Sequence, residues 1–271
     1  MSYQYRAGPD LIEQVLRELK DHCYVPEDAA FVHGTLDSPN RAIYYNDYSF
    51  LDALGYYQSE NILNDAVAML KKEGMIKGDY EAPHHMFDMY AYIVKNSFVV
   101  PWKSFTPTME RLVYAVSLYK KPRRILSVGV NCGYTQAWIM GHLWKSEQDD
   151  GNVYYALEKN PSLLHIAKKN LDGLRLPCAS HYIKGDASEV LDTLTETDFD
   201  MIFLDTRRDI GILHKLYGKL AKGGWLLMHN ASDPHFTVEM KPYLDFVRDL
   251  SHFEASMLFA VDAKGLELSI K

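Results

Sequence analysis

A glycine-rich run at residues 128–134 (VGVNCGY) comes directly after the apolar stretch RRILSV and directly before a segment of helical periodicity. Glycines in such a turn let the backbone approach a ligand closely, and the following helix N-terminus offers free N–H groups. A dinucleotide fingerprint needs glycine at its first, third and sixth positions, which here are Gly129, Asn131 and Tyr134. The run, which also contains Gly133, therefore predicts a ligand-binding turn outside the dinucleotide pattern. A tight turn that binds nothing is the alternative.

Acidic residues close the next two apolar runs. Glu158 ends NVYYALE, where a carboxylate can accept hydrogen bonds from both hydroxyls of a ribose; a solvated surface side chain is the alternative. Asp186 ends HYIKGD and is followed by Ala187 and Ser188, which can line an adenine pocket through backbone and hydroxyl contacts. Asp186 can also cap the next helix, and the two roles are compatible. These runs predict a nucleoside-binding edge.

The composition argues against several kinds of partner. The chain of 271 residues has 29 Lys plus Arg against 36 Asp plus Glu, a formal net charge of −7, so we expect neither nucleic acid nor an anionic membrane as a partner. Its N-terminus lacks the apolar run of a secretory signal, and no stretch approaches the roughly 18 apolar residues of a membrane span. Its three cysteines include no CxxC pair and fit reduced thiols. We expect a cytoplasmic protein.

The periodicity changes near residue 98, and we predict a domain boundary there. Residues 1–98 contain helical patterns and are predicted to form a helical cap or dimerisation region. In residues 99–271, short β-branched runs alternate with amphipathic segments, which implies right-handed βαβ units. Only a turn separates the last two runs, ASMLFAV and GLELSIK, so the last strand should be antiparallel. The predicted fold is α/β: a Rossmann-like, doubly wound, mostly parallel seven-stranded sheet with an antiparallel last strand, plus an N-terminal helical region.

Five motifs follow one another along the chain: VGVNCGYT, ALEKNP, KGDASEVL, FDMIFLDTRRD and LAKGGWLLMHN. This order resembles a class I S-adenosylmethionine-dependent methyltransferase of the catechol and caffeoyl-CoA O-methyltransferase type, over about residues 98 to 271. The resemblance implies S-adenosylmethionine as the cofactor, with the glycine-rich turn facing its methionine part, Glu158 its ribose and residues 186–188 its adenine. The implied cofactor-binding residues are Gly129, Asn131, Gly133, Tyr134, Glu158, Asp186, Ala187, Ser188 and Asp205.

The chain departs from this type at the metal site. Metal-dependent members hold magnesium or a similar ion through an Asp after the fourth strand and an Asp-Asn pair after the fifth. Asp205 matches the first position, but His229-Asn230 occupies the pair, so an imidazole replaces one carboxylate. A hard cation prefers oxygen ligands, so we expect no magnesium; a softer ion on Asp205, His229 and Asn230 is the alternative. Arg208 stands where the type has a catalytic lysine, and it cannot act as a base because it stays protonated.

The candidate catalytic residues are Asp205, His229 and Arg208, of which Asp205 and His229 can orient or deprotonate an acceptor. Substrate contacts are expected from Asn230, from Trp102 near the predicted boundary, and from Tyr45. Tyr45 belongs to a tyrosine cluster that can form an aromatic lid over the cofactor sulfonium, with core packing or a dimer interface as the alternatives.

The predicted function is transfer of the methyl group of S-adenosylmethionine to an oxygen or nitrogen of a small-molecule acceptor, by a homodimer. Two alternatives remain. The same cofactor could donate or cyclise its aminocarboxypropyl (aminobutyryl) group, a reaction suggested by Asn131 and the altered metal residues. The chain could also be a non-catalytic binding module that keeps the methyltransferase fold.

Overall fold

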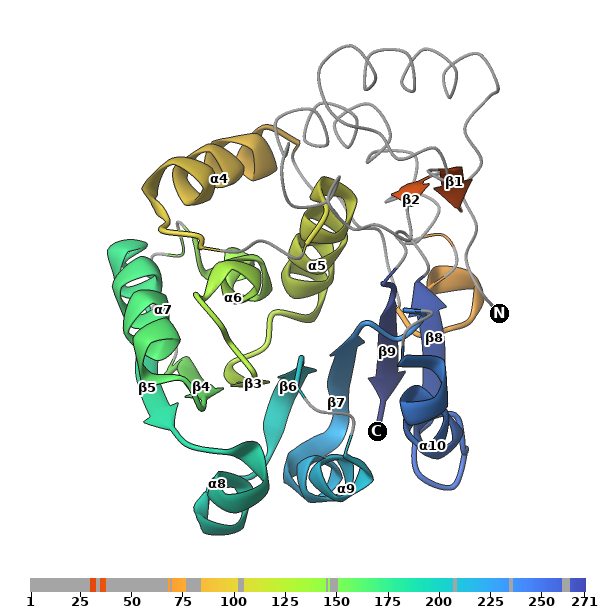
Figure 1. Ribbon diagram of the computed structural model, residues 1–271. Helices are drawn as coiled ribbons and strands as arrows, with labels where there is room; N and C mark the ends of the chain where they lie inside the picture. The colour runs from red at the N-terminus through yellow and green to blue at the C-terminus, as the bar shows by residue number, and fades with distance from the viewer. Residues whose placement is uncertain are drawn as a thin grey trace.

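The computed structural model describes residues 30–32, 35–37, 68, 70–76, 84–101, 105–144, 146, 151–206, 209–233, 236–259 and 264–271. Its centre is a seven-stranded sheet in the order β5-β4-β3-β6-β7-β9-β8 (Figure 1). The strands are β3 (Arg124–Val128), β4 (Val153–Glu158), β5 (Ala179–Lys184), β6 (Phe199–Leu204), β7 (Leu220–His229), β8 (Ala255–Phe259) and β9 (Leu266–Ile270). Pairing is parallel from β5 through β7, and β9 is antiparallel to both β7 and β8. The predicted sheet with an antiparallel last strand is confirmed.

Helices cover both faces of the sheet (Figure 1). One face carries α4 (His84–Ser97), α5 (Pro107–Lys120), α6 (Tyr134–Ile139) and α7 (Pro161–Gly173), and the other carries α8 (Ala187–Thr193), α9 (Ile210–Lys219) and α10 (Thr237–Val247). Each layer has its own apolar core against the sheet. The alternation of buried strand and amphipathic helix in the sequence builds this three-layer arrangement. No helix in the described ranges is long and apolar enough to cross a membrane.

The strand order reverses at β3. The chain moves outward from β3 to β4 and β5, then returns to place β6 on the other side of β3. In sheets of this kind ligands bind at the carboxyl ends of the strands beside such a reversal. The connections after β3, β4 and β6 therefore meet at one edge.

Side-chain caps fix where several of these helices begin. The Asn160 side chain accepts hydrogen bonds from the backbone N–H groups of residues 162 and 163, directly before Pro161 at the start of α7. Asp186 caps α8 in the same way, as predicted, and Asp209 caps α9. Such caps satisfy N–H groups that a helix start leaves unpaired. The short connections between strand and helix are thereby held in one conformation.

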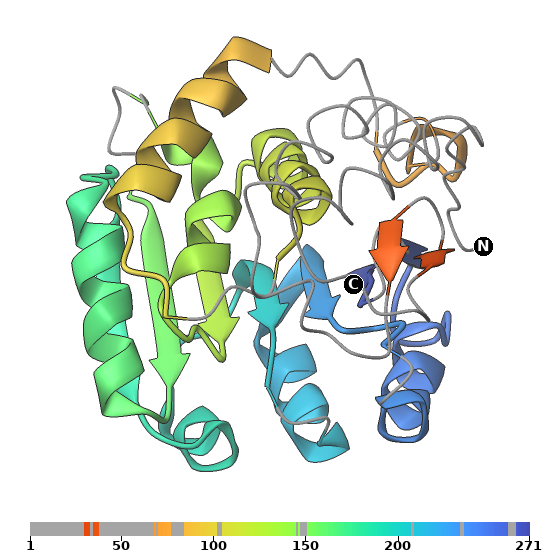
Figure 2. The same cartoon turned by 45° about the horizontal axis from the view of Figure 1, so that its top comes forward.

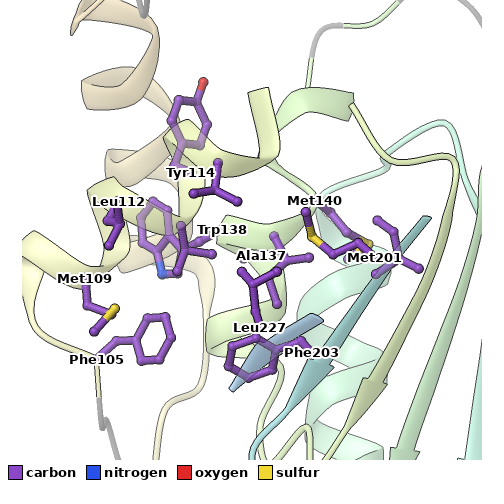
Figure 3. Packing of buried hydrophobic residues seen from close by; sticks show 14 of the residues in the cluster. Phe105, Met109, Leu112, Tyr114, Ala137, Trp138, Met140, Met201, Phe203 and Leu227 are labelled. Carbon is purple, nitrogen blue, oxygen red and sulfur yellow. The ribbon is translucent and has the colours of Figure 1, made fainter. Parts of the chain in front are cut away.

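The helix α4 precedes the predicted boundary at residue 98, yet its buried side chains belong to the apolar core between the sheet and the helices α5 to α7. The Tyr90 hydroxyl is buried and donates a hydrogen bond to the carbonyl oxygen of Ala137 in α6, at 2.7 Å. Phe87 and Tyr90 also contact the Trp138 ring, with centroids 5.5 and 5.7 Å away. Figure 2 shows α4 lying across this helical layer, and Figure 3 shows Trp138 among the buried side chains below it. The side chains of α4 thus help to fix α6, whose start follows the glycine-rich turn.

Two elements differ from the sequence prediction. The region before residue 98 was predicted as helical, but it contains a short antiparallel pair, β1 (Ala30–Val32) and β2 (Thr35–Asp37). The helix expected at about Tyr243 to Leu250 is α10, which begins earlier, at Thr237, and has Pro242 inside it. Its N-cap residue, Phe236, makes no side-chain cap, so the sequence carries no start signal there. Most of the predicted N-terminal cap lies outside the described residues.

A partly buried histidine, His142, joins the end of α5 to the short helix η1 (Gly141–Leu143). His142 Nε2 lies 2.9 Å from the carbonyl oxygen of Pro122, which can only accept, so this nitrogen carries the proton. Nδ1 then accepts from the Ser117 hydroxyl at 2.7 Å. Burial lowers the pKa of His142 to about 4. The folded protein therefore holds His142 neutral where an unfolded histidine would bind a proton.

Replacing His142 by Gln should reduce the acid sensitivity of folding. The stabilisation tied to the neutral imidazole is complete above the unfolded pKa of about 6.5 and is lost as pH falls towards about 4. Between pH 7.5 and 4.5 the free energy of unfolding of the unmodified protein should fall by about 2 to 3 kcal/mol more than that of His142→Gln. Urea unfolding at both pH values measures this. His252→Gln, at a part-exposed histidine, is the control and should keep the full drop; an equal drop in His142→Gln would contradict the assignment.

Candidate functional site

The turn between β3 and α6 has an unusual backbone. Gly129, Asn131 and Gly133 all have positive φ, at 83°, 49° and 82°. A Cβ on Gly129 would overlap the carbonyl oxygen of Asp205 at the end of β6. A Cβ on Gly133 would lie 3.2 Å from the Cα of Ala167 in α7. The two predicted glycines are therefore required by close approach as well as by conformation, and the turn is pressed between β6 and α7.

Glu158 holds the middle of this turn. Its side chain is 9% exposed, and Oε2 accepts a hydrogen bond from the backbone N–H of Asn131 at 2.9 Å. Oε1 accepts from the backbone N–H of Asn160, also at 2.9 Å. Each carboxylate oxygen has a second lone pair, so both can still accept from a ligand hydroxyl. The carboxylate thus faces the connections after β3 and β4, which is the position predicted for a ribose acceptor.

The connection after β5 is closed by Asp186. Its Oδ1 accepts from the backbone N–H and from the hydroxyl of Ser188, at 3.1 and 2.8 Å. Ala187 is buried, and the Ser188 carbonyl accepts from Lys215 Nζ. The Ser188 hydroxyl is therefore already used within the cap. A contact from this segment to a ligand would come from its backbone or from Asp186.

A polar cluster lies where β6 and β7 end. Asp205 Oδ1 accepts a hydrogen bond from Asn230 Nδ2 at 3.1 Å, and Asp205 Oδ2 lies 3.2 Å from His229 Nδ1. The three residues that the sequence grouped together thus touch one another. The Asp205 side chain is 26% exposed, whereas that of His229 is fully buried. Asp205 and Asn230 are both partly exposed, and Asp205 is therefore the carboxylate of the cluster that a bound molecule can reach.

The far side of the His229 ring is apolar. The Phe105 ring packs against it at a centroid distance of 4.7 Å. His229 Nε2 is buried and has no hydrogen-bond partner among the described residues. The proton of a neutral imidazole is best placed on Nδ1, where the Asp205 carboxylate accepts it. His229 then holds and orients that carboxylate.

This cluster does not suit magnesium. A hard divalent cation needs several oxygen ligands, and within the described ranges no group of three or more His, Cys, Asp or Glu side chains could hold a metal ion. Asp205 is the single carboxylate of the trio, and the imidazole and amide nitrogens are directed at it. One carboxylate, one imidazole and one amide give too little negative charge for such an ion.

Other predicted site residues have different settings. The Tyr134 hydroxyl donates to Glu110 Oε1 at 2.6 Å in the buried interior, so its side chain joins α6 to α5. Only its backbone, at the start of α6, remains beside the turn. Arg208, Trp102 and Tyr45 lie outside the described residues.

The sequence prediction missed Asn170 of α7. Its side chain is buried and bonds to the carbonyl oxygen of Cys132 in the turn, at 2.8 Å. The available signal is an amide on the helix face that otherwise carries Leu164, Ala167 and Leu171. A polar residue in an apolar stripe usually has a specific buried partner.

Comparisons with known proteins show which proteins the chain is similar to. Residues 126–231 match a family model described as a methyltransferase domain. A protein-L-isoaspartate O-methyltransferase of Bordetella avium (strain 197N) is 28% identical over 132 residues, which span 49% of this chain and 44% of the relative. The chain thus spans less than half the length of that curated relative.

Solved structures share the fold. Cofactor-bound Rv0187 from MTB has a TM-score of 0.52 at 15% identity, over 70% of this chain and 90% of its own. An O-methyltransferase from Bacillus cereus in complex with SAH has a TM-score of 0.52 at 15% identity, over 76% and 96%. The family match thus places a methyltransferase domain at residues 126–231, and the solved structures share the fold of the described sheet.

Proposed function

We propose that the protein transfers the methyl group of S-adenosylmethionine to an oxygen or nitrogen of a small-molecule acceptor, without magnesium. The observation that carries the proposal is the meeting of the glycine-rich turn, Glu158 and Asp205 at one edge of the sheet. The names of the Bordetella relative and the Bacillus structure favour oxygen as the acceptor atom. The predicted homodimer, the cytoplasmic location and the cap of residues 1–98 stay predictions.

The cofactor would lie along the connections after β3, β4 and β5. The turn at Gly129, Asn131 and Gly133 would face the methionine part, because it follows β3 at the carboxyl ends of the strands, where sheets of this kind bind ligands. Glu158 would accept from the ribose hydroxyls, and the segment from Asp186 to Ser188 would border the adenine. In this arrangement the sulfonium would lie near Asp205, whose backbone touches Gly129.

The acceptor must lose a proton as the new bond forms. In an in-line displacement the acceptor oxygen bonds to the methyl carbon, the carbon–sulfur bond breaks, and S-adenosylhomocysteine leaves. We propose that Asp205 accepts the acceptor's hydrogen bond and takes its proton, since it is the one carboxylate of the cluster and is partly exposed. His229 and Asn230 hold that carboxylate from behind. His229, predicted as a base from the sequence, would act through Asp205.

Product analysis tests the proposal against its alternatives. The protein, incubated with S-adenosylmethionine and a panel of hydroxylated and amino acceptors that includes an isoaspartyl peptide, should release S-adenosylhomocysteine and a methylated small molecule. Release of methylthioadenosine would instead show aminocarboxypropyl transfer, for which the buried Asn131 Oδ1, without a partner among the described residues, leaves a polar contact open. Binding without turnover would favour the non-catalytic module, and methylation of the peptide alone would contradict a small-molecule acceptor.

Replacing Glu158 by Ala should weaken cofactor binding. The change removes the acceptor for the ribose hydroxyls and also leaves the Asn131 N–H without its partner. Loss of such contacts costs about 1 to 3 kcal/mol, so the dissociation constant for S-adenosylhomocysteine should rise about 10-fold or more in calorimetry. Glu189→Ala, at an exposed acidic residue in α8, is the matched control. Unchanged affinity in Glu158→Ala would remove this residue from the cofactor site.

Replacing His229 by Ala should lower activity about 100-fold or more in steady-state kinetics, because Asp205 loses the group that holds it.

Activity of the unmodified protein should survive extensive chelation, as measured by turnover with and without a chelator. His229→Asp would add a carboxylate and should make activity respond to magnesium. If chelation abolishes turnover of the unmodified protein and magnesium alone restores it, the metal-free mechanism is wrong. Restoration by zinc, iron or nickel alone would support a softer ion at this cluster.

A further inference from the structure

Asn170 is a buried amide near the end of α7 whose bonds all leave its own helix. Its side chain is 4% exposed. Oδ1 accepts from the backbone N–H of Val99 at 3.0 Å, and Nδ2 donates to the carbonyl oxygen of Val99 at 2.9 Å and to that of Cys132 at 2.8 Å. An asparagine amide has two N–H donors, so both are used. Replacing an amide with this bonding pattern would leave unpaired groups inside the protein.

One of these bonds fixes the cofactor turn. Contacts from β4 and its following connection already hold the turn, because the Gly129 N–H donates to the Leu157 carbonyl oxygen and the Asn131 N–H donates to Glu158. Asn170 holds the Cys132 carbonyl, next to the start of α6. Its helix also touches the turn directly, because Ala167 and Leu171 lie against Gly133. The end of the turn therefore depends on α7 for its position.

The other two bonds fix the chain that leaves α4. Val99 lies between α4 and the segment that contains Trp102, a predicted acceptor contact. Its own side chain is half exposed, so its backbone bonds to Asn170 are the contacts that anchor it. The neighbouring Phe98 packs edge-on against Tyr134 at 6.4 Å, at the start of α6. One amide thus holds both the turn after β3 and the chain that leaves α4.

We propose that Asn170 is a positioning residue for methyl transfer, which sets the turn after β3 against the described segment that follows α4, residues 98–101. The inference rests on the proposed function. Asn170 touches neither reactant; it acts through the carbonyl of Cys132 and the backbone of Val99. It therefore affects cofactor affinity and turnover together, beyond any effect on folding.

Asn170→Asp is the sharpest test, because it keeps the shape and the acceptor oxygen but turns the amide nitrogen into an oxygen. That oxygen faces two carbonyl oxygens when the carboxylate is charged, and it can donate to one of them when protonated. At pH 8 the affinity for S-adenosylhomocysteine should fall about 10-fold or more, and part of it should return at pH 5.5. Asn96→Asp is the matched control: Asn96 also donates to a backbone carbonyl, that of Tyr92, but on the exposed side of α4. Its affinity should stay unchanged.

Amide hydrogen exchange without any cofactor gives an independent readout. In Asn170→Leu and Asn170→Asp the amides of Val99 and Gly133 should exchange about 10-fold faster, while those of β6 stay protected. Melting temperatures identify variants that fail to fold, and Asn170→Asp is retained if Asn170→Leu does not fold. If the unmodified protein does not bind S-adenosylhomocysteine, the proposed function fails while the exchange data still test the anchor. If it binds, and Asn170→Asp binds equally well at both pH values with unchanged exchange, the inference about Asn170 is overturned.

Discussion

The contact between the backbone of Gly129 and the carbonyl of Asp205 sets the geometry of the whole edge. No side chain fits between them, so the turn after β3 passes directly over the end of β6. Parallel pairing of β3 with β6 brings these two segments together, and the Asp205 N–H donates to the Val128 carbonyl at 2.9 Å. Under the proposed function, a cofactor along the turn would lie beside Asp205, the partly exposed carboxylate of the polar cluster.

Rigidity at this edge comes from buried polar side chains outside the turn. Glu158 and Asn170 hold the turn by its backbone, and His229 and Asn230 hold Asp205. Glu158, Asn170 and His229 belong to β4, α7 and β7, so side chains on regular elements position irregular segments, which is how precise sites are commonly supported. In the proposed function, the backbone of the turn and the Glu158 carboxylate face the cofactor, and the Asp205 carboxylate faces the acceptor.

The sequence predicted the sheet, its antiparallel last strand and the grouping of Asp205, His229 and Asn230, because these depend on apolar runs and on residues that directly follow strands. It also predicted that Asp186 caps a helix, which is a local pattern. It could not place the Tyr134 hydroxyl on Glu110, or the Asn170 amide on Cys132, because those bonds depend on how helices pack. The packing of α4 into the main core is missed for the same reason: contacts such as Tyr90 to Ala137 join residues far apart in the chain.

The most direct measurement is a crystal structure of the protein with S-adenosylhomocysteine. The account predicts the ribose hydroxyls within hydrogen-bond distance of Glu158, the methionine part against the turn from Gly129 to Gly133, and the sulfur facing the side chain of Asp205. A ligand bound elsewhere, or bound with its sulfur turned away from Asp205, would contradict the central claim.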